Sequence, residues 1–412
     1  MTAATSVSPA APRAERPPAS ALAAFALLER IRFGSLDVVL PDGTVRRFGQ
    51  EGSGPRAAVT LANWRPPAAA LRSGDVGFGD AFVDGDWTSP DLVALLSLFI
   101  ANRDAIEAAV YGSWWGSLAG RLRDLLRRNT KRGARANILA HYDLGNAFYA
   151  LWLDPTMLYS SALFEGDPAR TLEAAQQAKV RRALDAVRLG PGERLLEIGC
   201  GWGGLATAAA QERGARVVGL TLSDAQLAAG NERLAAAGVP AGQVSLRLQD
   251  YRDLGRGERF DAVCSIEMVE AVGRAWWPAY FGAVSRALKP GGRACIQSIT
   301  IRDDLFDRYL QSTDWIRQSI FPGGCLPSPA QFRVEAEQAG LRVVEQFAFG
   351  ADYVLTLRRW RERFLQQESA VRAQGFDARF VRAWELYLAY CEAAFASGNT
   401  DVVQFTLEKP ES

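Results

Sequence analysis

An acidic residue followed by a glycine-rich turn is the strongest chemical signal in this chain of 412 residues. The segment Glu197-Ile-Gly-Cys-Gly-Trp-Gly-Gly204 ends a predicted buried strand and opens a predicted helix. Gly199, Gly201 and Gly203 allow the backbone to approach a ligand closely, and the helix N-terminus offers free N–H groups. Such a turn binds either a dinucleotide or S-adenosylmethionine. Glu197 favours the second, because a carboxylate repels a pyrophosphate and attracts the cationic amino-acid part of S-adenosylmethionine.

Two further segments would complete this cofactor site. Thr221, Ser223 and Gln226 follow the second predicted strand, where the ribose hydroxyls would lie. Asp250 and Tyr251 follow the third strand, where an acid can accept a hydrogen bond from the adenine amino group. Ligands of parallel sheets bind beyond the carboxyl ends of the strands, so these residues are expected at one edge of a sheet.

The elements that must position these residues alternate between strand and helix from about residue 190 onward. Such alternation predicts an α/β fold with a doubly wound, parallel sheet. The expected strands cover residues 194–198, 216–221, 244–248, 260–266 and the segment after a turn at 289–292, and the expected helices cover 205–212 and 224–237.

A smaller, β-rich region precedes this part, over about residues 30–100. Asp42-Gly43 is a strong hairpin-turn signal between two alternating runs. The glycines between residues 74 and 85 predict a turn-rich stretch, and residues 91–100 predict a short helix. Residues 1–20 are rich in Ala, Pro and Ser and lack the apolar centre of a signal peptide, so we expect a disordered tail.

A basic run occupies residues 121–135, after Trp114 and Trp115, with seven Arg or Lys residues against the single acid Asp124. Aromatic residues followed by a basic amphipathic helix are typical of binding to an anionic membrane surface. A solvated helix face beside a domain linker explains the run equally well. The sequence leaves both interpretations open.

The composition argues against several other classes of protein. The formal net charge is +1, so we expect no nucleic-acid partner. With the single histidine His141, a Ser-His-Asp hydrolase or a metal enzyme is disfavoured, and we expect no metal site. Five scattered cysteines without a C-x-x-C pair fit a reducing compartment. The longest apolar stretch, Leu92 to Ile100, is far below the ~20 residues of a membrane span, so we expect a cytoplasmic protein that reaches lipid from outside.

Longer motifs extend the pattern over most of the chain. In chain order they are His141-Tyr-Asp-Leu-Gly-Asn-Ala-Phe-Tyr149, Trp152-Leu-Asp-Pro-Thr-Met-Leu-Tyr-Ser160, Leu196-Glu-Ile-Gly-Cys-Gly-Trp-Gly203, Ser265-Ile-Glu-Met-Val-Glu-Ala-Val-Gly273, Phe321-Pro-Gly-Gly-Cys-Leu-Pro327, Asp352-Tyr-Val-Leu-Thr356, Tyr390-Cys-Glu-Ala-Ala-Phe395 and Asp401-Val-Val-Gln-Phe405. On these motifs the chain resembles the cyclopropane-fatty-acyl-phospholipid synthases and their mycolic-acid relatives, from about Gly34 to Lys409.

That resemblance implies a domain organisation and a set of partners. A disordered tail and leading helix would cover residues 1–29, and an N-terminal lipid-contact domain with a basic linker helix would cover 30–135. Residues 136–412 would form a seven-stranded methyltransferase domain with acyl-pocket insertions. The partners would be S-adenosylmethionine, unsaturated phospholipid acyl chains and an anionic membrane surface, with the protein peripheral at the inner membrane face. A homodimer is left open.

The resemblance also assigns further site residues. Tyr159 and Ser160 would contact S-adenosylmethionine. Glu270 and Tyr353 match positions around a bound bicarbonate that is thought to remove a proton from the transferred methyl group. Cys391 matches a cysteine often labelled as the active site, although it is equally consistent with a small buried apolar side chain.

The chain departs from the family at two of the expected ion contacts. Ser161 stands where cyclopropane synthases have a cysteine, and Gln297 stands where they have a histidine. Both can donate hydrogen bonds to an anion, but neither carries the charge or the proton capacity of histidine. Binding of bicarbonate, and removal of a proton from the methyl group, are therefore in question.

We expect an S-adenosylmethionine-dependent C-methyltransferase that acts on the double bond of unsaturated fatty-acyl chains of phospholipids, of the cyclopropane-fatty-acid synthase type. One alternative is methylation without ring closure, which gives methylene- or methyl-branched chains. Another is a small-molecule N- or O-methyltransferase, which shares the cofactor motifs but needs neither the basic run nor the segment 321–327 as a lid. A non-enzymatic protein that binds S-adenosylmethionine is the third, and Glu270 with Tyr353 argues against it.

The basic run predicts a measurable membrane affinity. Neutralising Arg127, Arg128, Lys131 and Arg132 together should weaken sedimentation with anionic vesicles, because each basic residue near such a surface contributes about 1 kcal/mol. The loss should be larger at low salt, where exposed charges are less screened. Equal sedimentation of the variant and the parent would show that the run is only a solvated face.

Overall fold

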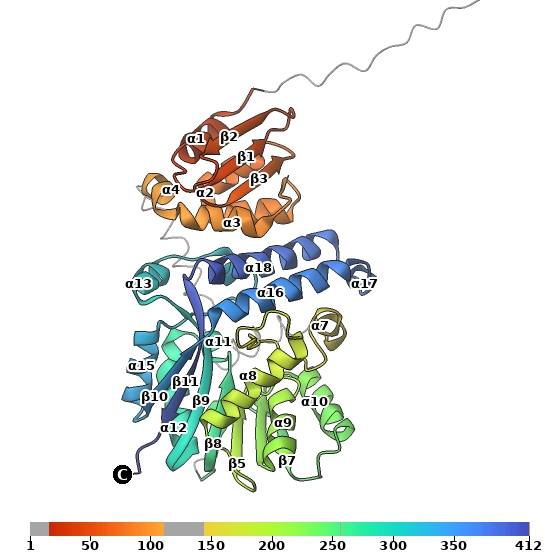
Figure 1. Ribbon diagram of the computed structural model, residues 1–412, viewed down its shortest axis with the longest axis vertical. Coiled ribbons are helices and arrows are strands. Elements are labelled where there is room, and N and C mark those ends of the chain that lie inside the picture. The colour runs from red at the N-terminus through yellow and green to blue at the C-terminus, as the bar shows by residue number, and fades with distance from the viewer. Residues whose placement is uncertain (1–15, 111–143, 256, 412) are drawn as a thin grey trace, which may run out of the picture. The chain divides into compact units, whose positions relative to one another are not determined.

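The computed structural model describes residues 16–110, 144–255 and 257–411. The basic run and His141, on which parts of the sequence analysis rest, lie outside the described residues. The chain divides into two compact units, residues 1–113 and 114–412, each drawn in Figure 1 and each considered by itself below.

The smaller unit is a four-stranded sheet with helices packed against it. The strand order is β2-β1-β3-β4, with β1 antiparallel to β2 and parallel to β3. Its elements are α1 (Ala19–Leu28), β1 (Ser35–Val39), β2 (Val45–Gly49), β3 (Arg56–Leu61), α2 (Arg65–Val83), β4 (Trp87–Thr88), α3 (Leu92–Ala101) and α4 (Arg103–Val110). The hairpin predicted at Asp42-Gly43 joins β1 to β2, and the helix predicted near residue 91 is α3, capped by the Asp91 side chain.

The turn-rich stretch predicted between residues 74 and 85 is wrong, because most of it lies in helix α2. The glycines have local roles within that helix. Gly74 has a φ of 60° and forms a kink, and a Cβ atom at Gly77 would lie 2.2 Å from the carbonyl oxygen of Ala69. A kink and a close backbone approach both favour glycine inside a helix, so these residues do not mark loops here.

The larger unit is built on a seven-stranded sheet in the order β10-β11-β9-β8-β5-β6-β7. Strands β9, β8, β5, β6 and β7 are parallel, and β11 runs antiparallel between β9 and β10. Their bounds are β5 (Arg194–Ile198), β6 (Arg216–Thr221), β7 (Val244–Leu248), β8 (Phe260–Ile266), β9 (Leu288–Ile301), β10 (Arg342–Ala348) and β11 (Thr400–Glu408). The predicted doubly wound methyltransferase sheet is confirmed, and the expected turn at 289–292 belongs to the long strand β9.

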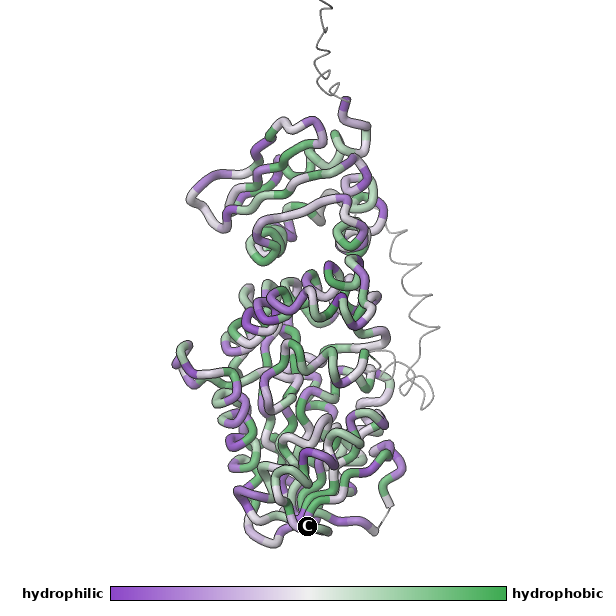
Figure 2. Tube along the Cα trace, turned by 90° about the vertical axis from the view of Figure 1, so that its right-hand side faces the viewer, coloured by the Kyte–Doolittle hydropathy of each residue, from purple (hydrophilic) through white to green (hydrophobic). Residues whose placement is uncertain are grey.

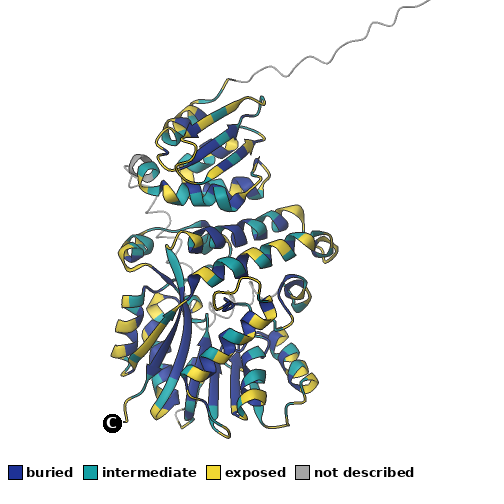
Figure 3. Ribbon diagram, in the orientation of Figure 1, coloured by how far each residue is buried: buried dark blue, intermediate teal, exposed yellow. Residues whose placement is uncertain are grey.

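Helices cover both faces of this sheet and bury two apolar clusters. Residues of α8 and α9 pack on one face, and residues of α12 and α15 pack on the other. The central strands are almost wholly buried, whereas the outer helices alternate buried and exposed residues and apolar and polar ones (Figures 2 and 3). The bounds of these helices are α8 (Leu172–Ala186), α9 (Gly204–Arg213), α10 (Asp224–Ala236), α12 (Trp277–Ala287) and α15 (Pro329–Gln338).

Two long helices, α16 (Gly350–Gln366) and α18 (Ala378–Ala396), pack against each other and cross above the carboxyl ends of the parallel strands (Figure 1). We call this pair the roof helices. The remaining elements of the unit are α7 (Asn146–Trp152), α11 (Val269–Val272), α13 (Asp303–Gln311), α14 (Trp315–Ser319), α17 (Glu368–Ala373) and the 3-10 turns η1 (Tyr251–Asp253) and η2 (Arg274–Trp276). Among the described helices, none is both long and apolar enough to cross a membrane.

Candidate active site

The glycine-rich turn lies at the carboxyl end of β5, between this strand and helix α9. Gly199 has a φ of 83°, and a Cβ atom there would lie 2.3 Å from Cγ of Met268. Gly203 has a φ of 78° and forms the N-cap of α9. Side chains at either position would be strained, so the turn needs glycine to bring the backbone and the helix N-terminus to the site.

Glu197 is the second-to-last residue of β5. Its side chain is buried, and its Oε2 atom has no hydrogen-bond partner among the described residues. Burial raises the pKa of this carboxyl to about 8, while the Ala206 backbone N–H and the Lys179 ammonium act in the opposite direction. A buried carboxyl with a free oxygen beside a glycine turn fits the cationic amino group of S-adenosylmethionine.

The expected ribose and adenine residues lie at the ends of the next two strands. Thr221 Oγ1 donates to Gln226 Oε1 at 2.9 Å, and the Ser223 side chain caps helix α10. Asp250 binds Arg252 through two hydrogen bonds of 2.9 and 2.6 Å. The sequence analysis missed Arg252, which engages both oxygens of the carboxylate predicted to bind adenine.

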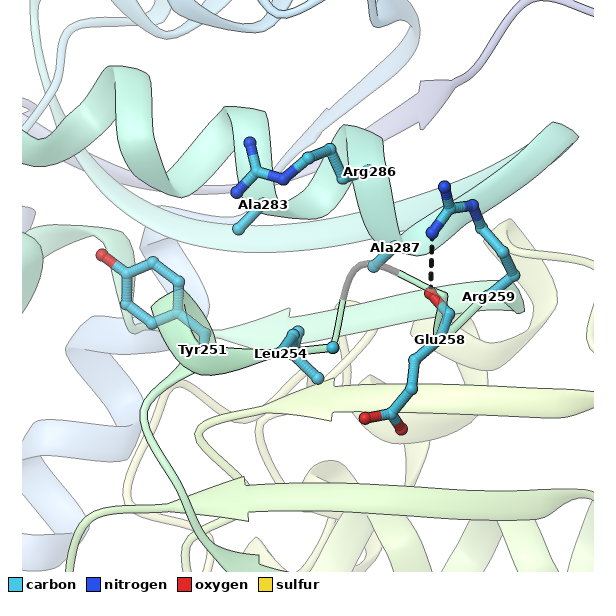
Figure 4. A pocket seen from close by; sticks show the side chains of 8 residues that line it. Tyr251, Leu254, Glu258, Arg259, Ala283, Arg286 and Ala287 are labelled. Atoms are coloured by element: carbon cyan, nitrogen blue, oxygen red, sulfur yellow. Dashed lines mark hydrogen bonds between the residues drawn. The ribbon is translucent and has the colours of Figure 1, made fainter.

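Tyr251, also expected at the adenine, is buried and packs edge-on against Tyr280 with ring centroids 5.5 Å apart. Figure 4 shows a pocket that Tyr251 lines together with other residues, among them Leu254, Glu258 and Arg286. Glu267 and the residues that donate hydrogen bonds to it, described below, do not line this pocket.

Ser160 is held by a buried lysine that the sequence analysis missed. Lys179 on α8 is fully buried and donates from Nζ to Ser160 Oγ at 2.5 Å. Burial lowers the pKa of Lys179 to about 8, and the acids Glu267, Asp154 and Glu197 raise it. The ammonium is therefore the positive charge that balances a group of buried carboxyls.

Tyr159 belongs to an aromatic cluster beneath the roof helices. Its hydroxyl shares a hydrogen bond of 2.7 Å with the hydroxyl of Tyr387 on α18. Its ring lies 5.3 to 5.5 Å, centroid to centroid, from Tyr149, Trp152 and Trp360. Such a cluster excludes water and presents ring faces that attract positive charge.

Three of the five predicted catalytic residues converge on one carboxylate, Glu267. The backbone N–H of Ser161 and the side-chain Nε2 of Gln297 both donate to Glu267 Oε1 at 2.8 Å. The hydroxyl of Tyr353 donates to Glu267 Oε2, also at 2.8 Å. The structure thus brings Ser161, Gln297 and Tyr353 together, as donors to a side chain that the sequence analysis had not singled out.

Glu267 adopts an unusual backbone conformation at the end of β8. Its φ of 51° lies in the left-handed region, which is uncommon for a residue with a side chain. Burial raises the pKa of Glu267, whereas the Lys179 ammonium, the Ser161 N–H, the Tyr353 hydroxyl and the Gln297 amide lower it. A strained residue whose charged form accepts three hydrogen bonds is typical of a functional site.

A signal for Glu267 was present in the sequence. Glu267 and Glu270 are two acids three residues apart, directly after a buried parallel strand, and the carboxyl ends of such strands form the ligand site. The spacing does not tell which of the two acids receives the donors.

Glu270, predicted as a catalytic residue, lies on α11 next to this centre. Its Oε1 accepts a hydrogen bond from the backbone N–H of Ile299, and its Oε2 has no hydrogen-bond partner among the described residues. Burial, together with the negative charge of Glu267, raises the pKa of Glu270 to about 8. The two carboxyls therefore differ in their surroundings: Glu270 accepts one backbone N–H, whereas Glu267 has three donors that stabilise its charged form.

Cys391, the fifth predicted catalytic residue, lies on roof helix α18 and has a free thiol. Burial raises the pKa of this thiol above its usual value, and Asp314 adds to the effect. In the described part of the chain, no hydrogen bond joins Cys391 to Glu267 or to its donors. Since the thiolate is the nucleophilic form, the surroundings of Cys391 are those of a packing residue.

Comparison with known proteins shows the family to which the chain belongs. Residues 129–405 match the family described as mycolic acid cyclopropane synthetase. The chain is 39% identical, over 407 residues, to the tuberculostearic acid methyltransferase UfaA1 of Mycobacterium tuberculosis, covering 96% of this chain and 93% of the relative. It is 34% identical, over 383 residues, to the cyclopropane-fatty-acyl-phospholipid synthase of Escherichia coli, covering 90% and 96%.

Among solved structures, the chain is similar to mycolic acid cyclopropane synthases. The mycolic acid cyclopropane synthase CmaA1, in complex with SAH and CTAB, superimposes with a TM-score of 0.62 and 32% identity. The match covers 67% of this chain and 98% of that protein.

The unsatisfied oxygen of Glu197 predicts how the cofactor binds. Glu197→Ala should remove most of the affinity for S-adenosylmethionine, because a buried charge pair is lost. In the parent, the carboxyl with its pKa near 8 must lose its proton when the cationic ligand binds. Binding at pH 7 should therefore release a proton and become tighter as the pH rises through 8.

Isothermal titration calorimetry in buffers of different ionisation enthalpy measures both effects. Glu212→Gln, on the exposed end of α9, is the matched control and should bind as the parent does. Unchanged affinity in Glu197→Ala would contradict the assignment.

Proposed function

The chain belongs to the mycolic acid cyclopropane synthetase family and is an S-adenosylmethionine-dependent methyltransferase, and on that premise we propose that it methylates a double-bond carbon in unsaturated acyl chains of phospholipids without closing a ring. The expected product is a methylene- or methyl-branched chain. Both a methyltransferase and a cyclopropane synthase are among its relatives, so the choice between the two products rests on the site.

The observation that carries the proposal is the position of the Glu267 carboxylate. Ser161, Gln297 and Tyr353 were predicted to surround a bound bicarbonate. In this chain the Gln297 amide and the Tyr353 hydroxyl donate to Glu267 instead. The backbone N–H of Ser161 also donates to Glu267, while the Ser161 hydroxyl donates to the carbonyl oxygen of Ala162. A carboxylate that already fills the donor set supports a base that belongs to the protein. It also argues against a bound bicarbonate at the same donors, because two negative charges close together in a buried site repel strongly.

The reaction needs an environment that tolerates a cation. Bound S-adenosylmethionine supplies a sulfonium methyl group, which the π electrons of the alkene attack while the carbon–sulfur bond breaks. The acyl chain is then a carbocation at the neighbouring carbon. The aromatic cluster around Tyr159 and Trp360 can face this cation and keep water away from it, and the charge on Glu267 adds electrostatic stabilisation.

The fate of the cation depends on which proton the base removes. Hydride migration from the methyl-bearing carbon moves the cation to that carbon. Loss of a methyl proton to Glu267 then leaves the C–H electrons as the C=C bond of a methylene branch, and loss of a chain proton leaves a methyl-branched alkene. In ring closure, the C–H electrons of the methyl group would instead bond to the original cation. A base fixed by a strained backbone and three donors samples fewer positions than a mobile ion, which favours one outcome.

The cellular setting belongs to the same proposal. The relatives act on lipid chains, and the basic run at 121–135 suits an anionic membrane surface. We place the enzyme on the cytoplasmic face of the inner membrane as a peripheral protein, with residues 30–135 as the lipid-contact part and residues 136–412 as the catalytic part.

Product analysis tests the proposal directly. The enzyme is incubated with methyl-labelled S-adenosylmethionine and vesicles of monounsaturated phosphatidylglycerol, and the acyl chains are read by proton NMR and mass spectrometry. We expect vinylic or methyl-branch signals and no upfield cyclopropane methylene protons. If all products were cyclopropane acyl chains, the proposal would be wrong and the enzyme would be an ordinary cyclopropane synthase.

Variants of the base test its role. Glu267→Gln should lower kcat by about 10²- to 10⁴-fold, because it removes the proton acceptor while keeping the size of the side chain. Glu267→Ala leaves three donors without an acceptor, so added bicarbonate or formate should restore part of its rate. In the parent, activity should fall as the pH drops through the raised pKa of Glu267, because the base is lost on protonation.

The control is Glu337→Gln on the exposed face of α15, which should keep the activity of the parent. Full activity of Glu267→Gln would contradict a base at this position, whatever the product.

A further inference from the structure

A line of hydrogen bonds runs from Glu267 through the sheet to helix α8. Gln297 Nε2 on β9 donates to Glu267 Oε1 at 2.8 Å. Gln404 Nε2 on β11 donates in turn to Gln297 Oε1 at 3.1 Å. At the far end, the Arg182 guanidinium on α8 donates to Gln404 Oε1 at 2.8 Å. We call these three side chains, Arg182, Gln404 and Gln297, the amide relay.

The two glutamines of the relay are fully buried, and they are partners in the register of β9 and β11. The outer end is anchored near the surface. The side chain of Arg182 is 19% exposed, pairs with Glu345 at 2.7 Å and stacks over the ring of Phe347 at 3.8 Å. The line therefore has a fixed origin outside the catalytic centre.

The chemistry of the end groups sets the direction of the relay. A guanidinium can only donate, so the carbonyl oxygen of Gln404 must face Arg182 and its amino group must face inward. The carbonyl of Lys179 can only accept, and it takes a second hydrogen bond from the same Gln404 Nε2 at 3.3 Å. Both constraints leave Gln297 one favourable orientation, with its carbonyl toward Gln404 and its amino group toward Glu267.

Without this constraint, the Gln297 amide could turn over. Its carbonyl would then face the Glu267 carboxylate, and two acceptors would meet in a buried site. With the constraint, every dipole in the line points its positive end at Glu267, and hydrogen bonds in such a chain strengthen one another. The relay thus favours the charged form of the carboxylate.

We propose that Gln404 and Arg182 are positioning residues for the reaction, which hold the Gln297 amide as a permanent donor to Glu267. The inference rests on the proposed function, in which Glu267 acts as the base. Neither Gln404 nor Arg182 contacts the carboxylate, and both act through Gln297.

Other charged and titratable groups also face this centre. Lys179 on α8, Glu270 on α11 and Tyr353 on α16 influence Glu267 directly. Around the outer end of the relay lie Glu345 on β10 and Cys295 on β9. All of these groups remain in the variants proposed below, so a change in the pH profile would follow from the relay itself.

Two substitutions of Gln404 test the relay with the full-length enzyme and phosphatidylglycerol vesicles. Gln404→Leu removes both links and should lower kcat about tenfold, with the acidic limb of the pH profile moved up by roughly one unit. Gln404→Glu still accepts from Arg182 but cannot donate, so Gln297 should turn toward it and the loss should be larger. The KM for S-adenosylmethionine should stay within twofold of that of the parent in both variants.

Two further variants separate positioning from folding. Thr406→Val changes a residue of equal burial two positions along the same strand, whose hydroxyl bonds to Glu345, and it should leave the acidic limb in place. Arg182→Met alters only the partly exposed outer end of the relay. It should shift the acidic limb of the pH profile in the same direction as Gln404→Leu does, but by a smaller amount. Thermal unfolding of each variant shows whether a loss of rate is a loss of folded protein.

A double-mutant cycle gives the decisive outcome. If the relay acts as one unit, the kcat losses of Gln297→Leu and Gln404→Leu should be strongly non-additive. Additive losses, or a Gln404→Leu enzyme with the kcat and acidic limb of the parent, would overturn the inference. The rate is measured as the total methyl label transferred to acyl chains, whatever the product. A parent enzyme that makes only cyclopropane rings would therefore contradict the proposed product. The relay would still be tested by the double-mutant cycle.

Discussion

A carboxylate in a buried site must be hydrogen-bonded or it will take up a proton, and much of this catalytic unit is arranged around that constraint at Glu267. Its donors come from three separate places: the loop before α8, the strand β9 and the roof helix α16. The buried ammonium of Lys179 supplies the balancing charge. Each part of the unit therefore has to be in place before this side chain can stay charged.

The roof helices show how such placement is secured at a distance. Glu392 on α18 is almost fully buried and accepts hydrogen bonds from Arg358 and Arg361 on α16, at 2.9 and 3.0 Å. The carboxylate of Glu392 is buried, so losing its two Arg partners would leave an uncompensated charge, and these ion pairs therefore help to hold α16 against α18. That position sets where the Tyr353 hydroxyl lies and keeps the aromatic cluster closed over the strands.

The two acids after β8 illustrate how environment assigns different roles to the same side chain. Glu270 accepts one backbone N–H and faces the charge of its neighbour, so it holds a proton. Glu267 has the donors, at the expense of a left-handed backbone conformation. Two carboxyls with such different hydrogen-bond partners can place a base beside a neutral acid in one apolar site.

The alternating fold and the cofactor edge of the sheet could be predicted from the order of residues alone, because strand periodicity, glycine turns and the acid at Glu197 are local signals that depend on neighbouring residues. The resemblance to the cyclopropane synthases implied that Ser161, Gln297 and Tyr353 share one site. That they meet on Glu267 follows from the folded chain alone, since those donors lie 106, 30 and 86 residues away along the sequence. Burial and hydrogen bonding between distant segments decide which carboxyl stays charged, and neither can be read from the order of residues.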